Sequence, residues 1–413
     1  MTEGEIIVGL DIGTTKVCAV VAALSGDDRL NILGIGRSPS DGLTRGVVTN
    51  IEKTVRSIEN AIAEAESQSG VSIKSVIVSI AGDHIQSIQS RGVIAISGSD
   101  HEIAQADVHR LIEDTKRVAL PPDRKIIHVI PQEFIIDGQD GVYDPVGMSG
   151  VRLEANVHII TGLVTAAQNI FKCVQRGRLE VADMVLEPLA SSYAVLDEEE
   201  KEVGVALLDI GGGTTDLAVF EERTIRHTAV IGVAGKKVTD DIRKGLGILT
   251  EQAEKLKREH GFAYMPAIVD NEPISLPGIG GRAPIEIDKH LLCQIIQPRM
   301  EEILEIAAME IKRSGYSRHL SAGAVLTGGG SLIQGTPELA REVLGMPVKI
   351  GIPTGFGGGL VKEIENPMYA TAVGLVHHRL RQNNNASISF GNGREAGTFR
   401  YIFSKIKSWF DEL

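Results

Sequence analysis

The chain has 413 residues, of which 43% are hydrophobic and 23% charged, an ordinary globular composition with enough length for two cored domains. Its formal net charge of -12 would repel a phosphate backbone and no basic stripe is evident, so nucleic acid is not expected as a partner. The three cysteines are far apart and include no Cys-x-x-Cys pair, which argues against a disulfide framework or a zinc site and favours a reducing cytoplasm.

The first element is expected to be a β-hairpin with a polar tip. Apolar runs at 6–10 and 17–24 flank the sequence DIGTTK at 11–16, and its Asp11 and Lys16 argue against a signal peptide or a transmembrane span. The same pattern returns at 203–220, where DIGGGTTD forms the tip. The sequence therefore predicts an internal duplication of one hairpin.

Helical and strand-like segments alternate around both hairpins. A helix is predicted at Glu52–Ser69 before a strand at Val76–Ile80, and another at Pro298–Ser314 before a strand at Ala324–Thr327. This alternation predicts two α/β domains that face each other across a cleft.

Two excursions interrupt this alternation. Between Asp83 and Thr161 the pattern indicates an inserted subdomain with strands near 92–96 and 132–136 and a helix near 104–119. The second excursion runs from Lys236 to Arg299 and contains a predicted helix at Thr250–His260. Each excursion is expected to form a small unit beside one of the two domains.

The end of the chain predicts a linker followed by a membrane-binding helix. Residues 382–397 are polar and glycine-rich, which is typical of a flexible linker. The last segment begins at Thr398, and Lys and Arg flank an apolar stripe with helical spacing. A C-terminal helix docked on the protein body is the alternative. The stripe consists of Phe399, Ile402, Phe403, Ile406, Trp409, Phe410 and Leu413.

The two tips have the residues that a nucleotide triphosphate requires. Glycine lets a hairpin tip approach phosphates closely, threonine supplies hydroxyls, and Asp11 and Asp209 could hold the water shell of Mg²⁺. A single copy could be a simple tight turn, but two copies favour a phosphate site. The assigned residues are Gly13, Thr14, Thr15, Lys16, Gly211, Gly212, Gly213, Thr214 and Thr215.

A third glycine element follows a buried strand. The sequence LTGGGS at 326–331, with Gly328, Gly329 and Gly330, predicts a strand, a turn and then a helix that could approach an adenosine or its α-phosphate. It is not a Rossmann fingerprint, and the chain has no Walker A loop.

These motifs resemble those of known families. The tips LDIGTTK and LDIGGGTTD with LTGGGS resemble the phosphate and adenosine motifs of the actin, chaperone-ATPase and sugar-kinase superfamily, over Ile6 to Arg381. Four features resemble the FtsA family of bacterial cell-division proteins within it. They are the inserted subdomain, GGR-x-P at Gly280–Pro284, I-x-PR-x-EEI at Ile296–Ile303, and the amphipathic tail.

The resemblance implies an α/β, actin-like two-domain fold, with duplicated ribonuclease-H-like cores around a nucleotide cleft, an inserted subdomain and a C-terminal amphipathic helix. The implied units are a first core (1–83, 163–196 and 362–381), the inserted subdomain (84–162), a second core (197–235 and 300–361), its smaller subdomain (236–299), the linker (382–397) and the membrane helix (398–413).

The resemblance also implies the function. The expected protein binds ATP with Mg²⁺, polymerises with itself, and tethers the C-terminal peptide of FtsZ to anionic lipid on the cytoplasmic face of the inner membrane at the division site. It would help to recruit later division proteins and would be at most a slow ATPase.

Several site residues follow from the resemblance alone. Glu254 and Lys257 match a pair that contacts ribose and adenine, although they could be only an i,i+3 ion pair. Glu187 matches the residue that positions the attacking water, and its alternative role is a helix-start carboxylate. Asp216, with Asp209, is assigned to polarise water, and hairpin-end hydrogen bonding is the alternative. At Ala234 the family usually has a glycine, which puts close backbone approach there in doubt.

Arg282 and Arg299 match the residues that bind FtsZ, since an arginine suits a carboxylate-bearing peptide. Arg299 could instead pair with Glu301 or Glu302 on its own helix.

Two other functions on the same fold are open alternatives. A sugar or metabolite kinase would need a general base in a roomy cleft and would have no use for the tail. A pilus-assembly scaffold has an inserted subdomain but likewise no reason for this tail, so the sequence favours the membrane adaptor.

Overall fold

The computed structural model describes residues 5–24, 29–98, 100–271, 273–278 and 283–388. The predicted membrane helix, including its seven apolar residues, therefore lies outside the described residues, as do 389–397 of the predicted linker and Arg282. Within the described part of the chain, no helix is both long and apolar enough to cross a bilayer.

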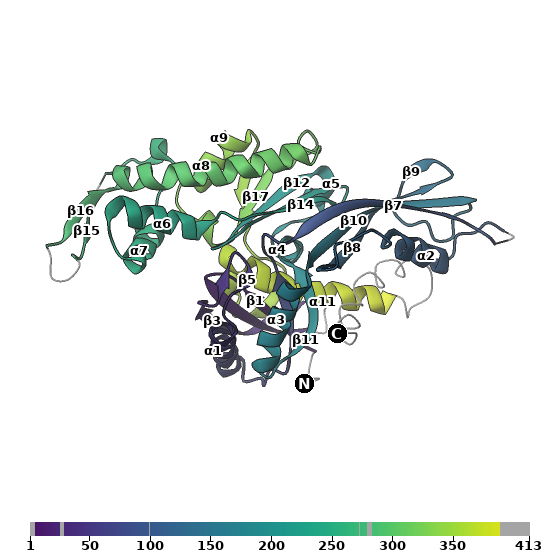
Figure 1. Cartoon of the computed structure of the whole chain (residues 1–413), viewed down its shortest axis with the longest axis horizontal. Coiled ribbons are helices and arrows are strands. Elements are labelled where there is room, and N and C mark those ends of the chain that lie inside the picture. The colour runs from purple at the N-terminus through teal and green to yellow at the C-terminus, as the bar shows by residue number, and fades with distance from the viewer. Residues whose placement is uncertain (1–4, 25–28, 99, 272, 279–282, 389–413) are drawn as a thin grey trace.

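The first core is a six-stranded sheet built on the first predicted hairpin (Figure 1). β1 pairs antiparallel with β2 from Ile6↔Ala23 to Ile12↔Val17, so the hairpin prediction is confirmed. The sheet order is β11-β6-β1-β2-β3-β19. Its strands are β1 (Ile6–Ile12), β2 (Lys16–Leu24), β3 (Leu30–Pro39), β6 (Ser75–Ile80), β11 (Glu180–Leu186) and β19 (Phe356–Gly359).

Helices cover both faces of this sheet, and glycines allow the close packing. A Cβ at Gly36 would lie 1.7 Å from the carbonyl oxygen of Ala61 in α1, and one at Gly9 would lie 2.4 Å from that of Ala372 in α11. The strand register places Gly9 and Gly36 on opposite faces. The helices are α1 (Ile51–Ser69), α3 (Val164–Arg176), α4 (Glu187–Val195) and α11 (Ala370–Ile388).

The second core repeats this plan. Its sheet order, β14-β13-β12-β17-β18, reproduces the order β3-β2-β1-β6-β11 of the first core, which confirms the internal duplication. The strands are β12 (Val205–Ile210), β13 (Thr215–Glu221), β14 (Thr224–Ile231), β17 (Ala324–Thr327) and β18 (Val348–Ile350). Its helices are α6 (Gly235–Leu246), α8 (Lys289–Arg313) and α9 (Thr336–Leu344).

Smaller elements complete the two halves. α7 (Thr250–His260) has the predicted bounds and lies beside α6 and the hairpin end of the second core (Figure 1). The others are β4 (Leu43–Thr44), β5 (Val47–Val48), α5 (Glu198–Val203), β15 (Pro273–Leu276), β16 (Ile285–Asp288) and α10 (Val361–Ile364).

The inserted subdomain has its own antiparallel sheet, in the order β7-β10-β8-β9, and extends to one side of the molecule (Figure 1). The strands are longer than the predicted pieces, while its helix is shorter. The elements are β7 (Gln86–Ala95), β8 (Arg124–Ile136), β9 (Gln139–Val142), β10 (Arg152–Leu163) and α2 (Gln105–Thr115). Phe134, Leu111 and Leu153 lie in a separate apolar core.

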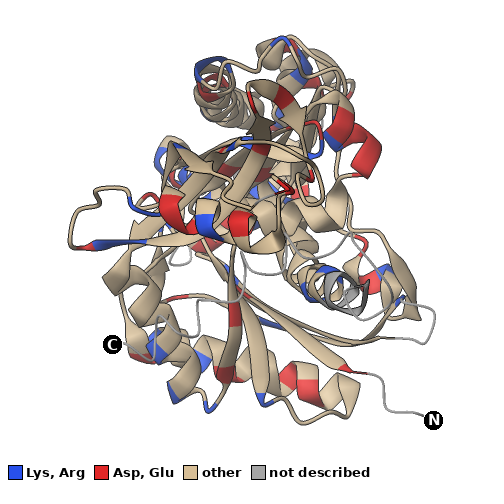
Figure 2. Ribbon diagram, turned by 90° about the vertical axis from the view of Figure 1, so that its right-hand side faces the viewer, with Lys and Arg blue, Asp and Glu red and all other residues tan. Residues whose placement is uncertain are grey.

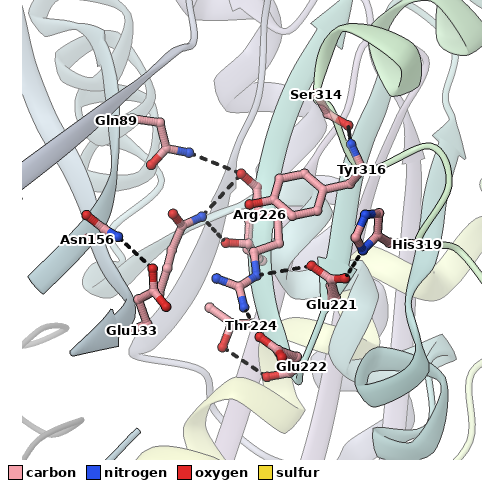
Figure 3. Close-up of polar contacts among 12 residues, drawn as sticks. Gln89, Glu133, Asn156, Glu221, Glu222, Thr224, Arg226, Ser314, Tyr316 and His319 are labelled. Carbon is pink, nitrogen blue, oxygen red and sulfur yellow. Dashed lines mark hydrogen bonds and ion pairs between the residues drawn. The ribbon is translucent and has the colours of Figure 1, made fainter. Parts of the chain in front are cut away.

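Side chains of the inserted subdomain bind β14, the edge strand of the second core (Figure 3). The Gln132 amide donates to the carbonyl oxygens of Ile225 at 2.7 Å and Arg226 at 3.2 Å, and Gln89 donates to the same Arg226 carbonyl. These amides therefore join the inserted subdomain to the second core at carbonyl groups of an edge strand.

Three sequence expectations need correction. The helix predicted to begin at Pro298 begins at Lys289, because the Asp288 side chain accepts a hydrogen bond from the Leu291 N–H and caps it there. β19, placed by sequence in the second core, pairs with β3 of the first. Residues 382–388, predicted as linker, continue helix α11.

Candidate functional site

The two hairpin tips meet where the two cores face each other. A Cβ at Gly212 would lie 2.4 Å from the Thr15 side chain, and one at Gly213 would lie 2.3 Å from the Thr14 hydroxyl. Real Cβ contacts are not this short, so only glycine allows the second tip to lie against the first. The sequence prediction of two cooperating tips is therefore matched by their geometry.

Both tips also have the same turn. The Gly13 N–H donates to the Lys16 carbonyl at 3.0 Å, and the Gly211 N–H donates to the Thr214 carbonyl at 2.9 Å. The Thr215 hydroxyl, in contrast, donates to the Val233 carbonyl at 2.9 Å and is fully buried. Thr215 thus holds the loop after β14, a structural role that its sequence assignment did not foresee.

The third glycine element lies beside the second tip. Gly328 has φ +80, and a Cβ there would lie 2.3 Å from Asp209 Oδ1, so this position requires glycine. A Cβ at Gly329 would meet nothing within 4 Å, which leaves open space at that residue. The helix predicted after this turn is a short 3-10 helix, Gly329–Leu332.

Four carboxyl groups gather behind the tips. Asp11, Asp209 and Asp216 are buried, and Glu187 is partly exposed. Removal from water raises the pKa of Asp209 to about 6, and burial together with the Asp209 charge raises the pKa of Asp216 to about 8. Desolvation, followed by the charges of Asp216, Asp11 and Asp209, raises the pKa of Glu187 well above its usual range.

This cluster suits a cation held through water. Asp216 Oδ1 is buried without a hydrogen-bond partner, and neighbouring carboxylates disfavour each other's charge, so a cation would offset both costs. Among the residues that the structure describes, no three or more His, Cys, Asp or Glu side chains are placed to ligate a metal directly. The donor set therefore fits Mg²⁺ with its own water shell.

Three hydroxyl residues that the sequence did not single out hold these carboxylates. The Ser79 hydroxyl donates to Asp11 Oδ1 at 3.0 Å. Ser191 donates to Asp209 Oδ2 at 2.6 Å, and the Thr371 hydroxyl is 3.3 Å from the same oxygen. No motif spacing signals these residues, because they come from distant elements of the chain.

Lys16 lies at the end of the first tip, where β2 begins. Its ammonium donates to the Met368 carbonyl oxygen and lies 4.9 Å from the centre of the Tyr369 ring. Its charge lowers the pKa of Asp11 and Asp209, against the larger effect of desolvation. Lys16 therefore offsets negative charge at the base of the two tips.

Glu254 and Lys257 form the expected ion pair and also lie beside the second tip. The Lys257 ammonium is 2.7 Å from Glu254 Oε2 and 3.1 Å from the Gly235 carbonyl oxygen. The Gly235 N–H in turn donates to the Gly211 carbonyl at 3.1 Å. The ion pair therefore forms as the alternative interpretation expected, and it also lies next to the glycines of the second tip.

Ala234 creates no strain at its position. Its φ of −160 and ψ of −162 describe extended backbone that alanine adopts freely, and the residue is buried. The backbone at Ala234 therefore does not require a glycine.

Arg299 pairs within its own region. Its Nε lies 2.6 Å from Asp241 Oδ2 of α6, and its Nη1 contacts Glu302 of its own helix. The alternative i,i+3 pair is thus present, together with a second partner that the sequence did not predict. The side chain is 27% exposed, so part of the guanidinium is accessible.

Comparisons with known proteins agree with this architecture. The family model described as "Cell division protein FtsA" matches residues 206–374, and "SHS2 domain inserted in FTSA" matches residues 82–161. The cell division protein FtsA of Pseudomonas aeruginosa is 48% identical over 410 residues, which covers 98% of each chain.

Solved structures share the fold. The type IV pilus biogenesis complex PilM-PilN has a TM-score of 0.66 at 16% identity, covering 91% of this chain and 98% of that chain. MreB5 of Spiroplasma citri bound to ADP has a TM-score of 0.56 at 15% identity, covering 94% and 99%. These similarities show an actin-like fold for this chain. The FtsA of Pseudomonas aeruginosa covers nearly the whole chain, and two FtsA family models match it. The chain therefore belongs to the FtsA family of bacterial cell-division proteins.

Proposed function

We propose that the chain binds Mg-ATP, polymerises, and tethers FtsZ to the cytoplasmic face of the inner membrane at the division site, where it helps to recruit later division proteins. ATP binding is proposed because two duplicated glycine tips lie against each other beside four carboxyl groups. The adaptor part is supported by membership in the FtsA family.

ATP would bind at the two tips. Backbone N–H groups and the hydroxyls of Thr14 and Thr15 would bind the phosphates, and Lys16 would move from the Met368 carbonyl to offset their charge. The open space at Gly329 and the Lys257 side chain beside the second tip would receive the nucleoside. Mg²⁺, when bound with ATP, supplies positive charge between the phosphates and the carboxylates, and Asp11 and Asp209 would hold its water shell.

Hydrolysis is expected to be slow at most. A general base must be ionised to accept a proton from water, but burial, together with the charges of the neighbouring acids, keeps the pKa of Glu187 well above its usual range. Asp216, with a pKa of about 8, is also largely protonated at neutral pH in the free protein. Both groups would need the bound cation before they could polarise the attacking water.

Partner and membrane binding would use other residues of the chain. The FtsZ C-terminal peptide would bind at Arg299 and Arg282, where its carboxylates would compete with Asp241 and Glu302 for the Arg299 guanidinium. Residues 398–413 would bind anionic lipid through their apolar stripe.

Fluorescent ATP binding to Gly212→Val tests the nucleotide site. A branched side chain at Gly212 would clash with Thr15 and disrupt the contact between the two tips, so ATP binding should be lost. Gly177→Ala, at the end of α3 where φ is −72, is the matched control and should bind as the parent does. Undiminished binding by Gly212→Val would sink the assignment.

A further inference from the structure

Two hydroxyls meet where helices α4 and α11 cross. A Cβ at Gly374 of α11 would lie 1.8 Å from the carbonyl oxygen of Ala190 in α4, so the helix backbones are in close contact there. Ser191 of α4 and Thr371 of α11 lie beside this crossing, and both are buried. Their hydroxyl oxygens are 3.0 Å apart. Tight packing therefore fixes this pair in place.

Both hydroxyls contact one oxygen of Asp209. Ser191 Oγ lies 2.6 Å and Thr371 Oγ1 lies 3.3 Å from Asp209 Oδ2, and Thr371 Oγ1 is also 3.4 Å from Glu187 Oε1. The other oxygen, Asp209 Oδ1, lies against Gly328 of the third glycine element. The hydroxyl pair thus contacts Oδ2 of Asp209, while Oδ1 faces the third glycine element.

The corresponding carboxylate of the first tip is held differently. Asp11 accepts a hydrogen bond from the hydroxyl of Ser79, which lies on strand β6 of the same sheet. Asp209 belongs to the second core, whereas α11 packs on β1, β2 and β6 of the first. The Thr371 contact therefore crosses between the two cores, so it depends on how the cores face each other.

We propose that Ser191 and Thr371 are positioning residues that orient Asp209 toward the water shell of Mg²⁺. This inference rests on the proposed function, because it assigns a supporting role within the Mg-ATP site. A carboxylate whose orientation is fixed before binding loses less rotational freedom when the metal arrives, and groups behind metal-binding residues commonly act in this way.

The chain offers matched variants for the test. Ser191→Ala and Thr371→Val remove the two hydroxyls with little change in volume. Ser192→Ala is the control, because the neighbouring Ser192 hydroxyl donates only to the Leu189 carbonyl of its own helix, at 2.8 Å. Thr371→Ser keeps the hydroxyl and should restore the parent's behaviour.

Binding of fluorescent ATP to the full chain should be titrated with Mg²⁺ and repeated in excess EDTA, with thermal unfolding as a second readout. Ser191→Ala and Thr371→Val should raise the Mg²⁺ concentration required for half-maximal effect by about 10- to 100-fold. ATP binding in EDTA should change by less than about twofold, since the two hydroxyls contact Asp209 and not the glycine or threonine residues of the tips. Ser192→Ala and Thr371→Ser should match the parent in both measurements.

Three results would overturn the inference. One is an unchanged Mg²⁺ requirement in Ser191→Ala and Thr371→Val, and another is a parent whose ATP binding does not depend on Mg²⁺. The third is equal loss of ATP binding with Mg²⁺ and with EDTA, alongside a lower melting temperature, which would indicate a purely structural role. If Thr371→Val does not fold, Ser191→Ala decides alone. If the parent binds no ATP under either condition, the proposed function itself fails, a result distinct from the other three.

Discussion

Lys16 occupies the end of the first tip, where its ammonium donates to the Met368 carbonyl oxygen and lies beside the Tyr369 ring. The OH group of the same tyrosine accepts a hydrogen bond from Arg37 at 2.6 Å. Two cations, Lys16 and Arg37, thus contact one aromatic residue. The Met368 and Tyr369 contacts therefore hold the Lys16 ammonium at the end of the first tip.

Replacement of Lys16 should weaken nucleotide binding. Lys16→Met removes the charge that opposes Asp11 and Asp209, and the phosphates would lose a charged hydrogen-bond donor. Such bonds contribute about 1.5 to 3 kcal/mol, so the Kd for Mg-ATP measured by calorimetry should rise by about tenfold or more. Lys53→Met, at an exposed position of α1, is the control. Equal affinity of Lys16→Met and the parent would exclude Lys16 from the site.

At the scale of elements, the contact between the inserted subdomain and β14 depends on buried polar groups. His158 of β10 lies 3.2 Å from the Gln89 amide and 3.1 Å from the Thr228 hydroxyl of β14. Nearby, the buried Arg226 pairs with Glu222, and Glu221 is 2.6 Å from His319 (Figure 3). This junction is thus polar, with His158, Thr228 and Arg226 buried and Gln89, Glu222 and His319 exposed.

The buried His158 predicts acid sensitivity. Burial, followed by the charge of His227, lowers the pKa of His158 to about 4 from its ordinary 6.5. Between these values the unfolded chain binds a proton that the folded protein does not, so the free energy of unfolding should fall as pH drops below 6.5. Burial lowers the pKa of His128 and His377 in the same direction.

Denaturant unfolding of His158→Gln at pH 7.5 and pH 5.0 tests this interpretation. The loss of stability between the two pH values should be smaller than the parent's by about 2 kcal/mol. The variant at the exposed His101, His101→Asn, should keep the parent's full loss. An identical loss in His158→Gln and the parent would show that His158 does not contribute to the acid sensitivity.

Helices α6 and α8 meet at the Arg299 ion pair, which permits a sharp test of the partner surface. Arg299→Met and Asp241→Asn break the same ion pair, but only the first removes the guanidinium. If Arg299 contacts the FtsZ peptide, Arg299→Met should weaken cosedimentation with FtsZ about tenfold, while Asp241→Asn should maintain or strengthen it. Equal weakening by both variants would mean that the ion pair only stabilises the helices.

At the scale of the whole molecule, the two cores are copies of one sheet plan, and α4 and α11 cross near the carboxylates that lie between them. The inserted subdomain extends from the first core and contacts the second through β14 (Figures 1 and 3). In the view of Figure 2, Lys and Arg residues are interspersed with Asp and Glu over the described ribbon. Nucleotide binding at the tips and the contact of the inserted subdomain with β14 would therefore both influence the relative orientation of the two cores.

Membrane attachment should depend on residues 398–413. Their stripe contains three phenylalanines, a tryptophan, two isoleucines and a leucine, each worth on the order of 1 to 2 kcal/mol when buried. Deletion of this segment should prevent flotation with anionic vesicles and leave ATP binding intact. Attachment should strengthen with polymerisation, because a polymer presents many tails to one bilayer.

Point variants separate a membrane helix from a docked one. Trp409→Glu places a charge on the apolar face and should imitate the deletion, whereas Lys407→Ala should have a small effect that grows with anionic lipid content. If Trp409→Glu floats as well as the parent, the segment does not bind membranes through this face.

The sequence alone determined the features that local patterns encode. A hairpin is specified within 20 residues by an apolar run, a tip of Asp, Gly and Thr, and a second apolar run. Both tips, with Asp11 and Asp209, could therefore be found without a structure. Boundaries were less certain. Pro298 is typical of a first helical turn but lies inside α8, and the polar residues after Arg381 continue α11 as far as Ile388.

Only the tertiary structure decided which side chains surround the tips. The hydrogen bond of Ser79 with Asp11 joins residues 68 positions apart, and that of Ser191 with Thr371 joins residues 180 positions apart. The contact of Gln132 with β14 spans more than 90 residues. No local pattern distinguishes these serines and amides from others on the same elements. Their partners are set by how two sheets and an inserted subdomain pack, since each element buries its apolar face against whichever neighbour the whole fold provides.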